Sequence, residues 1–215
     1  MDFNDYLEDL LGDSLALQED DSKIDFTSIL DYQNALDRQI FIGDITEGVG
    51  VAVDSIIRFW NAYDEKNNTP IEDRKPIKIF IDSNGGSLTD TLTVIDSIKY
   101  SKTPVYTICI GAAYSGGFFI FISGHKRFCY PNATFLYHEG STANGGDAGK
   151  FRNFADFYDK QLEVLKKITI SNTNIDEKLY EKHRRDDWWM LSDEAISLGV
   201  CDVILTREEN QSWDK

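Results

Sequence analysis

The chain has 215 residues, of which 41% are hydrophobic, 13% aromatic and 27% charged. This length suits one domain with short appendages, and the composition is that of a globular protein with a full hydrophobic core. Because the net charge of −15 repels phosphate groups, the sequence predicts neither nucleic acid nor an anionic membrane surface as a partner.

The first predicted segment is an acidic arm over residues 1–25, with Glu19, Asp20 and Asp21 at its centre. Its charge predicts flexibility. It lacks the basic and apolar regions of a secretory signal, and no stretch of the chain reaches 18 apolar residues. We therefore expect a cytoplasmic protein, with one domain over residues 26–205 and a tail over 206–215.

From residue 38 onwards, apolar strand patterns alternate with helical patterns, which indicates an α/β fold with a mainly parallel sheet. Asp44 and Glu47 have the spacing of a capping box for the first helix, Gly111 is predicted to open a turn, and the glycine-rich residues 139–150 are predicted to form a mobile loop. The predicted strands are 38–43, 77–81, 105–110, 127–130, 134–138 and 200–205. The predicted helices are 49–60, 88–98, 115–123, 151–170, 175–183 and 192–198.

The cysteines Cys109, Cys129 and Cys201 are isolated and have no CxxC spacing. They indicate neither a disulfide framework nor a zinc site, and Cys109 and Cys201 are predicted to be buried thiols. No metal or other cofactor is predicted.

Two glycine-containing turns each follow a predicted strand and precede a predicted helix. In residues 84–87, paired glycines let backbone N–H groups approach a ligand closely, although a simple tight turn has the same pattern. In residues 111–117, small residues flank Ser115 and leave its hydroxyl accessible at the start of a helix. A serine that only caps the helix would also fit there.

A serine hydroxyl needs a base to become a nucleophile, and that base needs a carboxylate to orient it. His138, at the end of a predicted strand, can supply the base. His125 is expected in a solvated turn and His183 on the surface. Asp186 and Asp187 are both candidates for the carboxylate, and the residues alone do not choose between them.

Taken together and in this order, these segments resemble the Clp proteolytic-subunit (ClpP) family of serine peptidases. The resemblance runs from about residue 38 to residue 205. Residues 79–87 are similar to the family's INSPGGS segment, 107–117 to its TICxGxAASMG segment, and 131–138 to its PNSxxMIH segment. Residues 187–195 with 198–202 resemble its D-x-F-M-S-A-x-E-A…GL-x-D pattern. Alignment on Glu194 and Ala195 places the family's triad aspartate on Asp187 rather than Asp186.

The resemblance implies a serine endopeptidase of the ATP-dependent Clp type. Ser115 would be the nucleophile, His138 its base and Asp187 the carboxylate that orients His138. The backbone N–H groups of Gly86 and Gly116 would form the oxyanion hole, and neither metal nor cofactor would be needed.

The family also implies a crotonase-like superhelix of repeated β-β-α units. Its protruding handle, a strand and a long helix, would span about residues 139–170. Subunits would form a homo-oligomer of two stacked heptameric rings around a chamber, a tetradecamer that takes protein or peptide substrates from an AAA+ unfoldase. The chain departs from the family at Asn84, Tyr114 and Gly116, where the motifs have Pro, a small residue and Met. Tyr114 is expected to change the shape of the pocket, and these departures suit a phage-type or accessory member.

Four alternatives remain open from the sequence. One is a catalytically silent ring subunit, and another is a phage head-maturation protease with the same fold. A third is a peptidase with a Ser–Lys dyad, for which Lys150 or Lys160 would supply the base. The last is a crotonase acting on acyl-CoA, although the chain lacks a basic cluster suited to the phosphates of that substrate.

Overall fold

A computed structural model describes residues 34, 36–140 and 147–207. The predicted arm over 1–25, most of the predicted tail and the centre of the glycine-rich loop lie outside these residues. Ile40–Lys215 forms one compact unit, separate from Met1–Gln39. In the described part of the chain, no helix is long and apolar enough to cross a membrane.

The strands that the structure describes form one sheet in the order β1-β2-β3-β4-β7, with β5 beside β3 and β6 beside β5. The pairs β2–β3, β3–β4, β3–β5 and β4–β7 are parallel, and β5–β6 is antiparallel. The expected mainly parallel sheet is therefore confirmed. The strands are β1 (Gln39–Ile42), β2 (Ile77–Ser83), β3 (Val105–Tyr114), β4 (Lys126–Cys129), β5 (Thr134–Tyr137), β6 (Trp188–Leu191) and β7 (Val203–Ile204).

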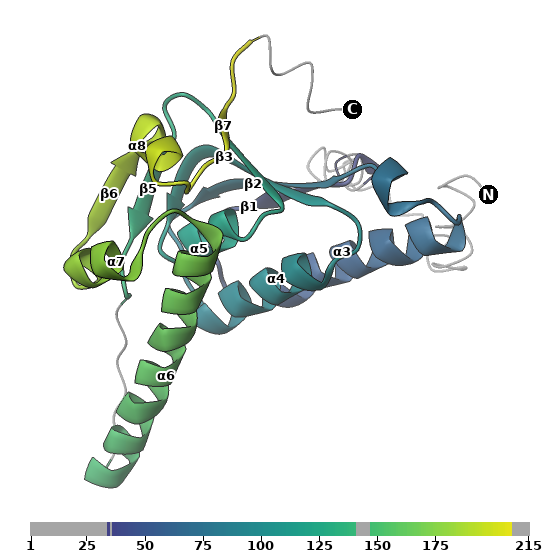
Figure 1. The fold of residues 1–215 in the computed structure, drawn as a ribbon. Helices are drawn as coiled ribbons and strands as arrows, with labels where there is room; N and C mark the ends of the chain where they lie inside the picture. Colours follow the sequence, from purple (N-terminus) through teal and green to yellow (C-terminus); the bar gives the residue numbers. More distant parts are fainter. Residues whose placement is uncertain (1–33, 35, 141–146, 208–215) are drawn as a thin grey trace, which may run out of the picture. The chain divides into compact units, whose positions relative to one another are not determined.

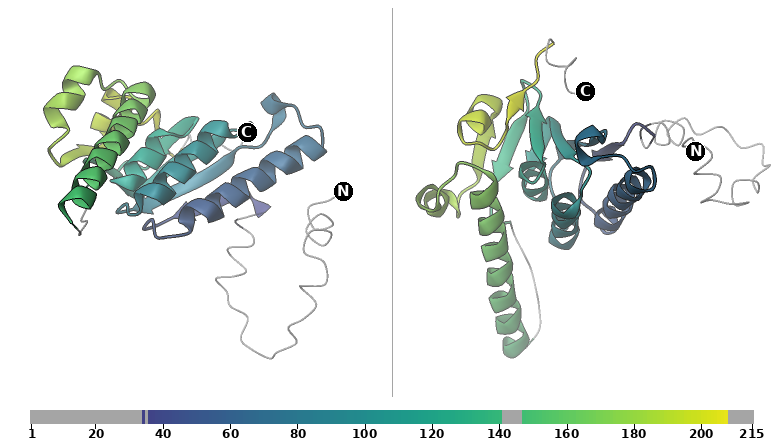
Figure 2. Two further views of the ribbon diagram at one scale, coloured as in Figure 1. Left: turned by 90° about the horizontal axis from the view of Figure 1, so that it is seen from below. Right: turned by 45° about the vertical axis from the view of Figure 1, so that its right-hand side comes forward.

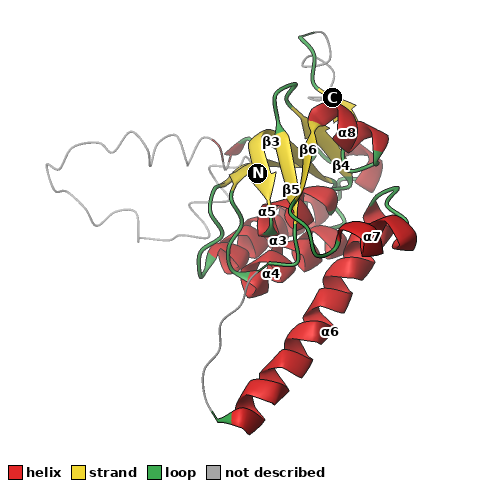
Figure 3. Cartoon of the chain, turned by 90° about the vertical axis from the view of Figure 1, so that its left-hand side faces the viewer, coloured by secondary structure: helices red, strands yellow, loops and turns green. Residues whose placement is uncertain are grey.

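Three helices, α3, α4 and α5, lie side by side against one face of the sheet (Figures 1 and 3). The core between these layers includes fully buried Ile79 of β2, Ile98 of α4 and Phe118 of α5. The described α-helices are α3 (Val49–Lys66), α4 (Leu88–Tyr100), α5 (Gly116–Ile122), α6 (Ala148–Asn172), α7 (Glu177–His183) and α8 (Ser192–Ser197), and a short 3-10 turn, η2, spans Ile71–Asp73.

Helix α6 projects away from the sheet, as Figure 1 and the right-hand view of Figure 2 show. Only Leu165 and Thr169 of this helix are buried among the residues that the structure describes. Apolar Phe151, Phe157 and Val164 are exposed along it. Helix α6 therefore leaves several apolar side chains exposed, and its role as the handle stays a prediction.

Helix α3 starts where predicted, but its cap differs from the prediction. The helix begins at Val49 with Gly48 as its N-cap, at φ 95°, so the predicted capping box of Asp44 and Glu47 is wrong. The carboxylate of Asp90 on α4 replaces it, because Asp90 Oδ1 accepts hydrogen bonds from the N–H groups of Gly48 and Gly50 at 3.0 Å each. The hydrogen bond from the hydroxyl of Ser87, together with those from Gly50 and Gly48, lowers the pKa of Asp90.

Strand β3 also runs further than predicted. It continues through Gly111 to Tyr114, so no turn opens at Gly111. The reason is that β3 changes partner along its length: residues 106–109 pair with β4, and residues 112–114 pair with β5. The sequence also missed β6, which pairs with the other edge of β5.

Candidate active site

Ser115 lies at the junction of β3 and α5 in an unusual backbone conformation. Its φ of 52° and ψ of −119° fall in a region that favours glycine, which is a mark of a strained position held by its surroundings. Its N–H donates to the carbonyl of Leu136 at 2.9 Å. Its side chain makes no capping hydrogen bond to α5, so the interpretation of Ser115 as a simple helix cap is wrong.

The strand register brings the other two predicted residues to this junction. Tyr114 pairs with Leu136 across β3 and β5, and Leu136 pairs with Trp189 across β5 and β6. The antiparallel register continues from Tyr137 and Trp188 to His138 and Asp187, which therefore face each other beyond the strand ends. Three separate segments of the chain thus meet at one end of the sheet.

The distances distinguish the two aspartates. His138 Nδ1 lies 3.7 Å from Asp187 Oδ1, within ion-pair range but longer than a hydrogen bond. Asp186 Oδ2 instead lies 3.9 Å from Nδ1 of His183. Since Nδ1 of His138 faces Asp187, Nε2 is the ring nitrogen left for a serine.

The glycine pair at residues 85 and 86 lets the turn after β2 approach Ser115. A Cβ on Gly85, where φ is 97°, would lie 2.6 Å from the Cβ of Ser115. A Cβ on Gly86 would lie 2.2 Å from the carbonyl oxygen of Ile45. Neither position accepts a side chain. The glycines therefore serve the close approach of this turn to Ser115 and Ile45, in addition to the turn itself.

The two predicted oxyanion donors are the backbone N–H of Gly86, in this turn, and the backbone N–H of Gly116, at the start of α5. The hydrogen bonds of the bridge run from Ile45 N to Gly85 O and from Ser87 N to Ile45 O, so the N–H of Gly86 points away from Ile45. A Cβ built on Gly116 would lie 3.6 Å from Gly86 N, which shows that the two glycines are neighbours. An oxyanion hole needs two such N–H donors close together, and that role for Gly86 and Gly116 stays a prediction.

A cavity of about 560 Å³ contains Ser115, Gly86, Gly116 and His138 in its lining. Its apolar wall comes from α4, α5 and α6: Leu88, Phe119, Phe154, Phe157, Tyr158 and Leu165. A second, polar cavity of about 220 Å³ also has His138 in its lining, together with Asp187. His138 therefore borders both a substrate-sized space and the space beside the carboxylate that faces it.

The other histidines have structural contacts. Nδ1 of His125 accepts a hydrogen bond from the N–H of Val105 at 2.9 Å, and burial lowers the pKa of His125. His125 nevertheless lies in a bend between α5 and β4 and is exposed, which confirms the predicted solvated turn. His183 stacks on Trp188 with ring centroids 4.3 Å apart, and its side chain is 23% exposed, so it is more enclosed than predicted. In the described residues, no group of three or more His, Cys, Asp or Glu side chains could hold a metal ion.

The family model for Clp protease matches residues 29–208 of the chain. This chain belongs to the Clp protease family. It is 30% identical over 184 residues to the ATP-dependent Clp protease proteolytic subunit of Leuconostoc citreum (strain KM20). The alignment covers 83% of this chain and 88% of that relative. Membership of this family, together with the mixed α/β sheet, supports a protease function.

Within this Clp family member, the structure explains two of the departures from the motifs. The hydroxyl of Tyr114 bonds the hydroxyl of Thr134 at 2.7 Å and its ring packs against Trp189, so Tyr114 is absent from the cavity lining and the expectation that it reshapes the pocket is wrong. A Cβ on Gly116 would lie 2.5 Å from Thr91 Oγ1, so Thr91 fills the space that a side chain at position 116 would need.

The Ser–Lys alternative receives no support from the cavity, because neither Lys150 nor Lys160 lines it. Lys150 instead pairs with Asp147 at 3.5 Å. All three cysteines, Cys109, Cys129 and Cys201, are buried thiols, which confirms the prediction for Cys109 and Cys201.

Proposed function

We propose that this chain is a serine endopeptidase with Ser115 as nucleophile, His138 as general base and Asp187 as orienting carboxylate. The observation that carries the proposal is the register of β3, β5 and β6, which sets these residues at one end of the sheet. Ser115 is held there at positive φ in the same cavity as His138.

In the first half of the reaction, Ser115 Oγ bonds to the carbonyl carbon of the peptide, and its proton passes to Nε2 of His138. The carbonyl oxygen becomes an oxyanion and accepts hydrogen bonds from the N–H groups of Gly86 and Gly116. Each such donor lowers the barrier by roughly 3–4 kcal/mol. The C–N bond then breaks, and His138 gives its proton to the leaving amine.

In the second half, a water molecule attacks the acyl-enzyme while His138 takes its proton, and Ser115 is regenerated when the carbon–Oγ bond breaks. Asp187 accepts from the Nδ1–H of His138 and stabilises the imidazolium form. That contact, 3.7 Å in the structure, must shorten by about 1 Å to become a charged hydrogen bond. Such bonds are commonly long in a resting site and tighten when substrate binds.

The assembly is also part of the proposal: a homo-oligomer of two stacked heptameric rings in the cytoplasm, with α6 as the handle between rings and an AAA+ unfoldase as the partner. Exposed Phe151 and Phe157 on α6 support a contact with another copy of the chain. A second apolar surface lies on the sheet, where exposed Phe41 stacks on Phe80 at 4.9 Å. It is the surface we expect a partner protein to bind.

The test is covalent labelling with a fluorophosphonate, located by mass spectrometry. We expect an adduct on Ser115 of the wild type and none in Ser115→Ala. Ser123→Ala is the matched control, because Ser123 lies at the other end of α5 and donates to the carbonyl of Phe119 at 2.8 Å. An assembled wild type that takes no label contradicts active hydrolysis and favours the silent ring subunit, the reading that the long His138–Asp187 contact would also fit.

A further inference from the structure

The residue after the histidine base, Glu139, is held from two directions. Its carbonyl oxygen accepts a hydrogen bond from the hydroxyl of Tyr158, on α6, at 2.9 Å. Its carboxylate accepts one from Nε of Arg184 at 2.8 Å. Both the main chain and the side chain next to His138 are therefore fixed by residues distant in the sequence.

Arg184 lies on the segment that carries the orienting carboxylate. It directly follows α7, its N–H donates to the carbonyl of Tyr180 at 2.8 Å, and it stands three residues before Asp187. Its Nη1 donates to Glu181 Oε2 at 3.1 Å. With two carboxylates on different nitrogens, the guanidinium plane is fixed rather than free to rotate.

The Glu139–Arg184 pair thus spans the same two segments as His138 and Asp187. The pair is 2.8 Å long, whereas the His138–Asp187 contact measures 3.7 Å. All four residues line the same polar cavity of about 220 Å³. The short Glu139–Arg184 contact therefore fixes the distance between the two segments. The longer His138–Asp187 contact must shorten across that distance.

The Glu139–Arg184 pair contributes little to the free energy of unfolding. The side chains of Arg184 and Glu139 are 30% and 20% exposed, and ion pairs with access to water contribute little to folding. A small positional error at a reacting centre, by contrast, lowers the rate by one to two orders of magnitude. The pair is placed where position matters more than stability.

We propose that Arg184 is a positioning residue that acts through Glu139 to hold His138 and Asp187 within reach of each other. The inference rests on the proposed function, because it assigns a role in the same triad. It predicts that disrupting the pair slows the chemical step while substrate binding is retained.

The test compares full-length Glu139→Gln, Arg184→Gln and the double variant with the wild type on a short peptide substrate. Each single change should lower kcat by about tenfold with KM within about twofold. The double variant should be no slower than the slower single one, because both changes break one interaction. Arg184→Lys, which can still reach Glu139 with one ammonium, should recover most of kcat.

Arg185→Gln is the matched control. Arg185 carries the same charge on the same turn and lines the same cavity, yet no polar contact is seen for its side chain within the described residues. Its kcat should stay within about twofold of wild type, and melting temperatures measured in parallel should be similar for all variants. Single variants as fast as wild type, additive losses in the double variant, or a loss of kcat that follows a loss of folded protein would each overturn the positioning role.

Fluorophosphonate labelling distinguishes a failure of the Arg184 role from a failure of the proposed peptidase function. Wild type labelled at Ser115, with Glu139→Gln and Arg184→Gln labelled equally fast, would leave the peptidase standing and reject the role of Arg184. Absence of label on Ser115 in the wild type would reject both. Labelling that slows in parallel with kcat supports the role of Arg184.

Discussion

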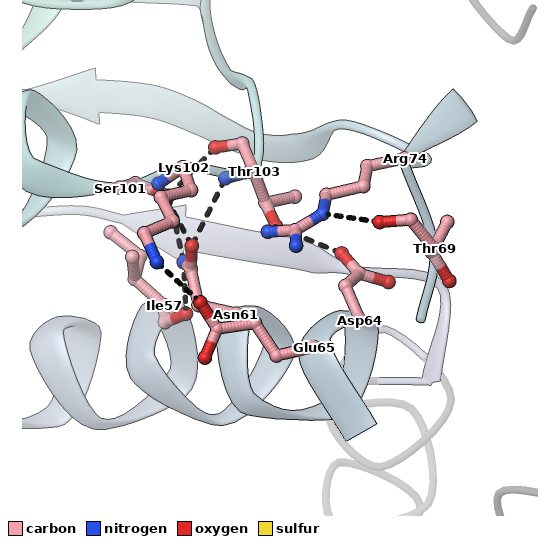
Figure 4. A network of polar contacts seen from close by, with 9 residues as sticks. All are labelled: Ile57, Asn61, Asp64, Glu65, Thr69, Arg74, Ser101, Lys102 and Thr103. Atoms are coloured by element: carbon pink, nitrogen blue, oxygen red, sulfur yellow. Dashed lines mark hydrogen bonds and ion pairs between the residues drawn. The ribbon is translucent and has the colours of Figure 1, made fainter. Parts of the chain in front are cut away.

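The polar cluster at the C-terminal end of α3 and the His138–Asp187 edge of the sheet are built in opposite ways. In the cluster, the side-chain amide of Asn61 donates to Ile57 O and Ser101 Oγ and accepts from the N–H groups of Lys102 and Thr103 (Figure 4). These four bonds measure between 2.8 and 3.0 Å. At the edge, the His138–Asp187 contact is 3.7 Å long and the Asp187 side chain is 65% exposed.

The rest of the cluster is hydrogen-bonded as well. Buried Thr103 donates to Asp64 Oδ2 at 2.8 Å, and Arg74 donates from Nε to Thr69 O at 3.1 Å and from Nη1 to Thr103 Oγ1 at 3.3 Å. Such a network specifies one geometry, because every group left without a partner would be costly. The His138–Asp187 edge instead has a longer contact and an exposed carboxylate, and the proposed base needs a contact that can shorten when its protonation state changes.

The largest effect should come from the edge. Asp187→Asn should lower kcat by about 10³–10⁴-fold, because the amide cannot hold His138 in the productive tautomer or stabilise its imidazolium form. Peptide hydrolysis under saturating substrate is the measurement.

Asp186→Asn is the control for that change. It removes the same charge at the neighbouring residue, whose carboxylate faces His183 rather than His138. Its kcat should fall by less than about threefold, and both variants should keep their stability within about 0.5 kcal/mol. Equal losses in the two variants would show that general charge near the edge, not the facing carboxylate, matters.

The second-largest effect should come from the polar cluster. It should lower the free energy of unfolding and leave kcat unchanged. Asn61→Ala leaves the N–H groups of Lys102 and Thr103 without their acceptor, so the free energy of unfolding should fall by about 1–3 kcal/mol. Urea denaturation at fixed protein concentration measures it.

Asn67→Ala, which removes an exposed amide bonded only to Tyr63 O among the described residues, should cost less than about 1 kcal/mol. The kcat of the folded fraction should be unchanged in both. If Asn61→Ala lowered kcat while its free energy of unfolding stayed unaltered, the polar cluster would not be the purely structural element that we infer.

The smallest effect should have the opposite sign. Tyr137 precedes His138 and is 2% exposed, and its buried hydroxyl makes no hydrogen bond of good geometry within the described residues, although it interacts with the hydroxyl of Tyr180. Burial raises the pKa of this hydroxyl, which stays neutral. Tyr137→Phe removes a buried hydroxyl that lacks a hydrogen bond of good geometry, and we expect the free energy of unfolding to rise by up to about 1 kcal/mol in thermal or urea unfolding.

Tyr158→Phe is the matched comparison, because that hydroxyl does have an acceptor, Glu139 O, and its loss should destabilise slightly. If both changes destabilise equally, the Tyr137 hydroxyl has a partner after all, such as an ordered water, and the edge is better satisfied than the contacts indicate.

Sequence reasoning found the parts of the site that carry a local signal. Ser115 stands among small residues between a strand and a helix, and His138 ends a strand, so both could be named from pattern alone. The choice of Asp187 over Asp186 needed the resemblance to the Clp family, because the two neighbours have the same chemistry. The contacts of Arg184, Glu139 and Tyr158 were missed, since ion pairs and hydrogen bonds between distant segments leave no local pattern.

The errors in the fold have the same cause. Asp44 and Glu47 have the spacing of a capping box, but Asp90 of α4 supplies the cap from 40 residues away. Four-residue β6 contains two tryptophans and lies next to a helix start, which gives too short a pattern to identify a strand.

The sequence by itself determined the alternation of strands and helices, the mainly parallel sheet, the family, and the serine and histidine of the candidate triad, because each rests on periodicity or on a short motif. Only the tertiary structure decided that β6 pairs antiparallel with β5, that Asp187 rather than Asp186 faces His138, and that Glu139 joins Arg184 beside them. Strand register and ion pairing are settled by which segments pack together, and the packing energy that selects them is shared among residues far apart in the chain.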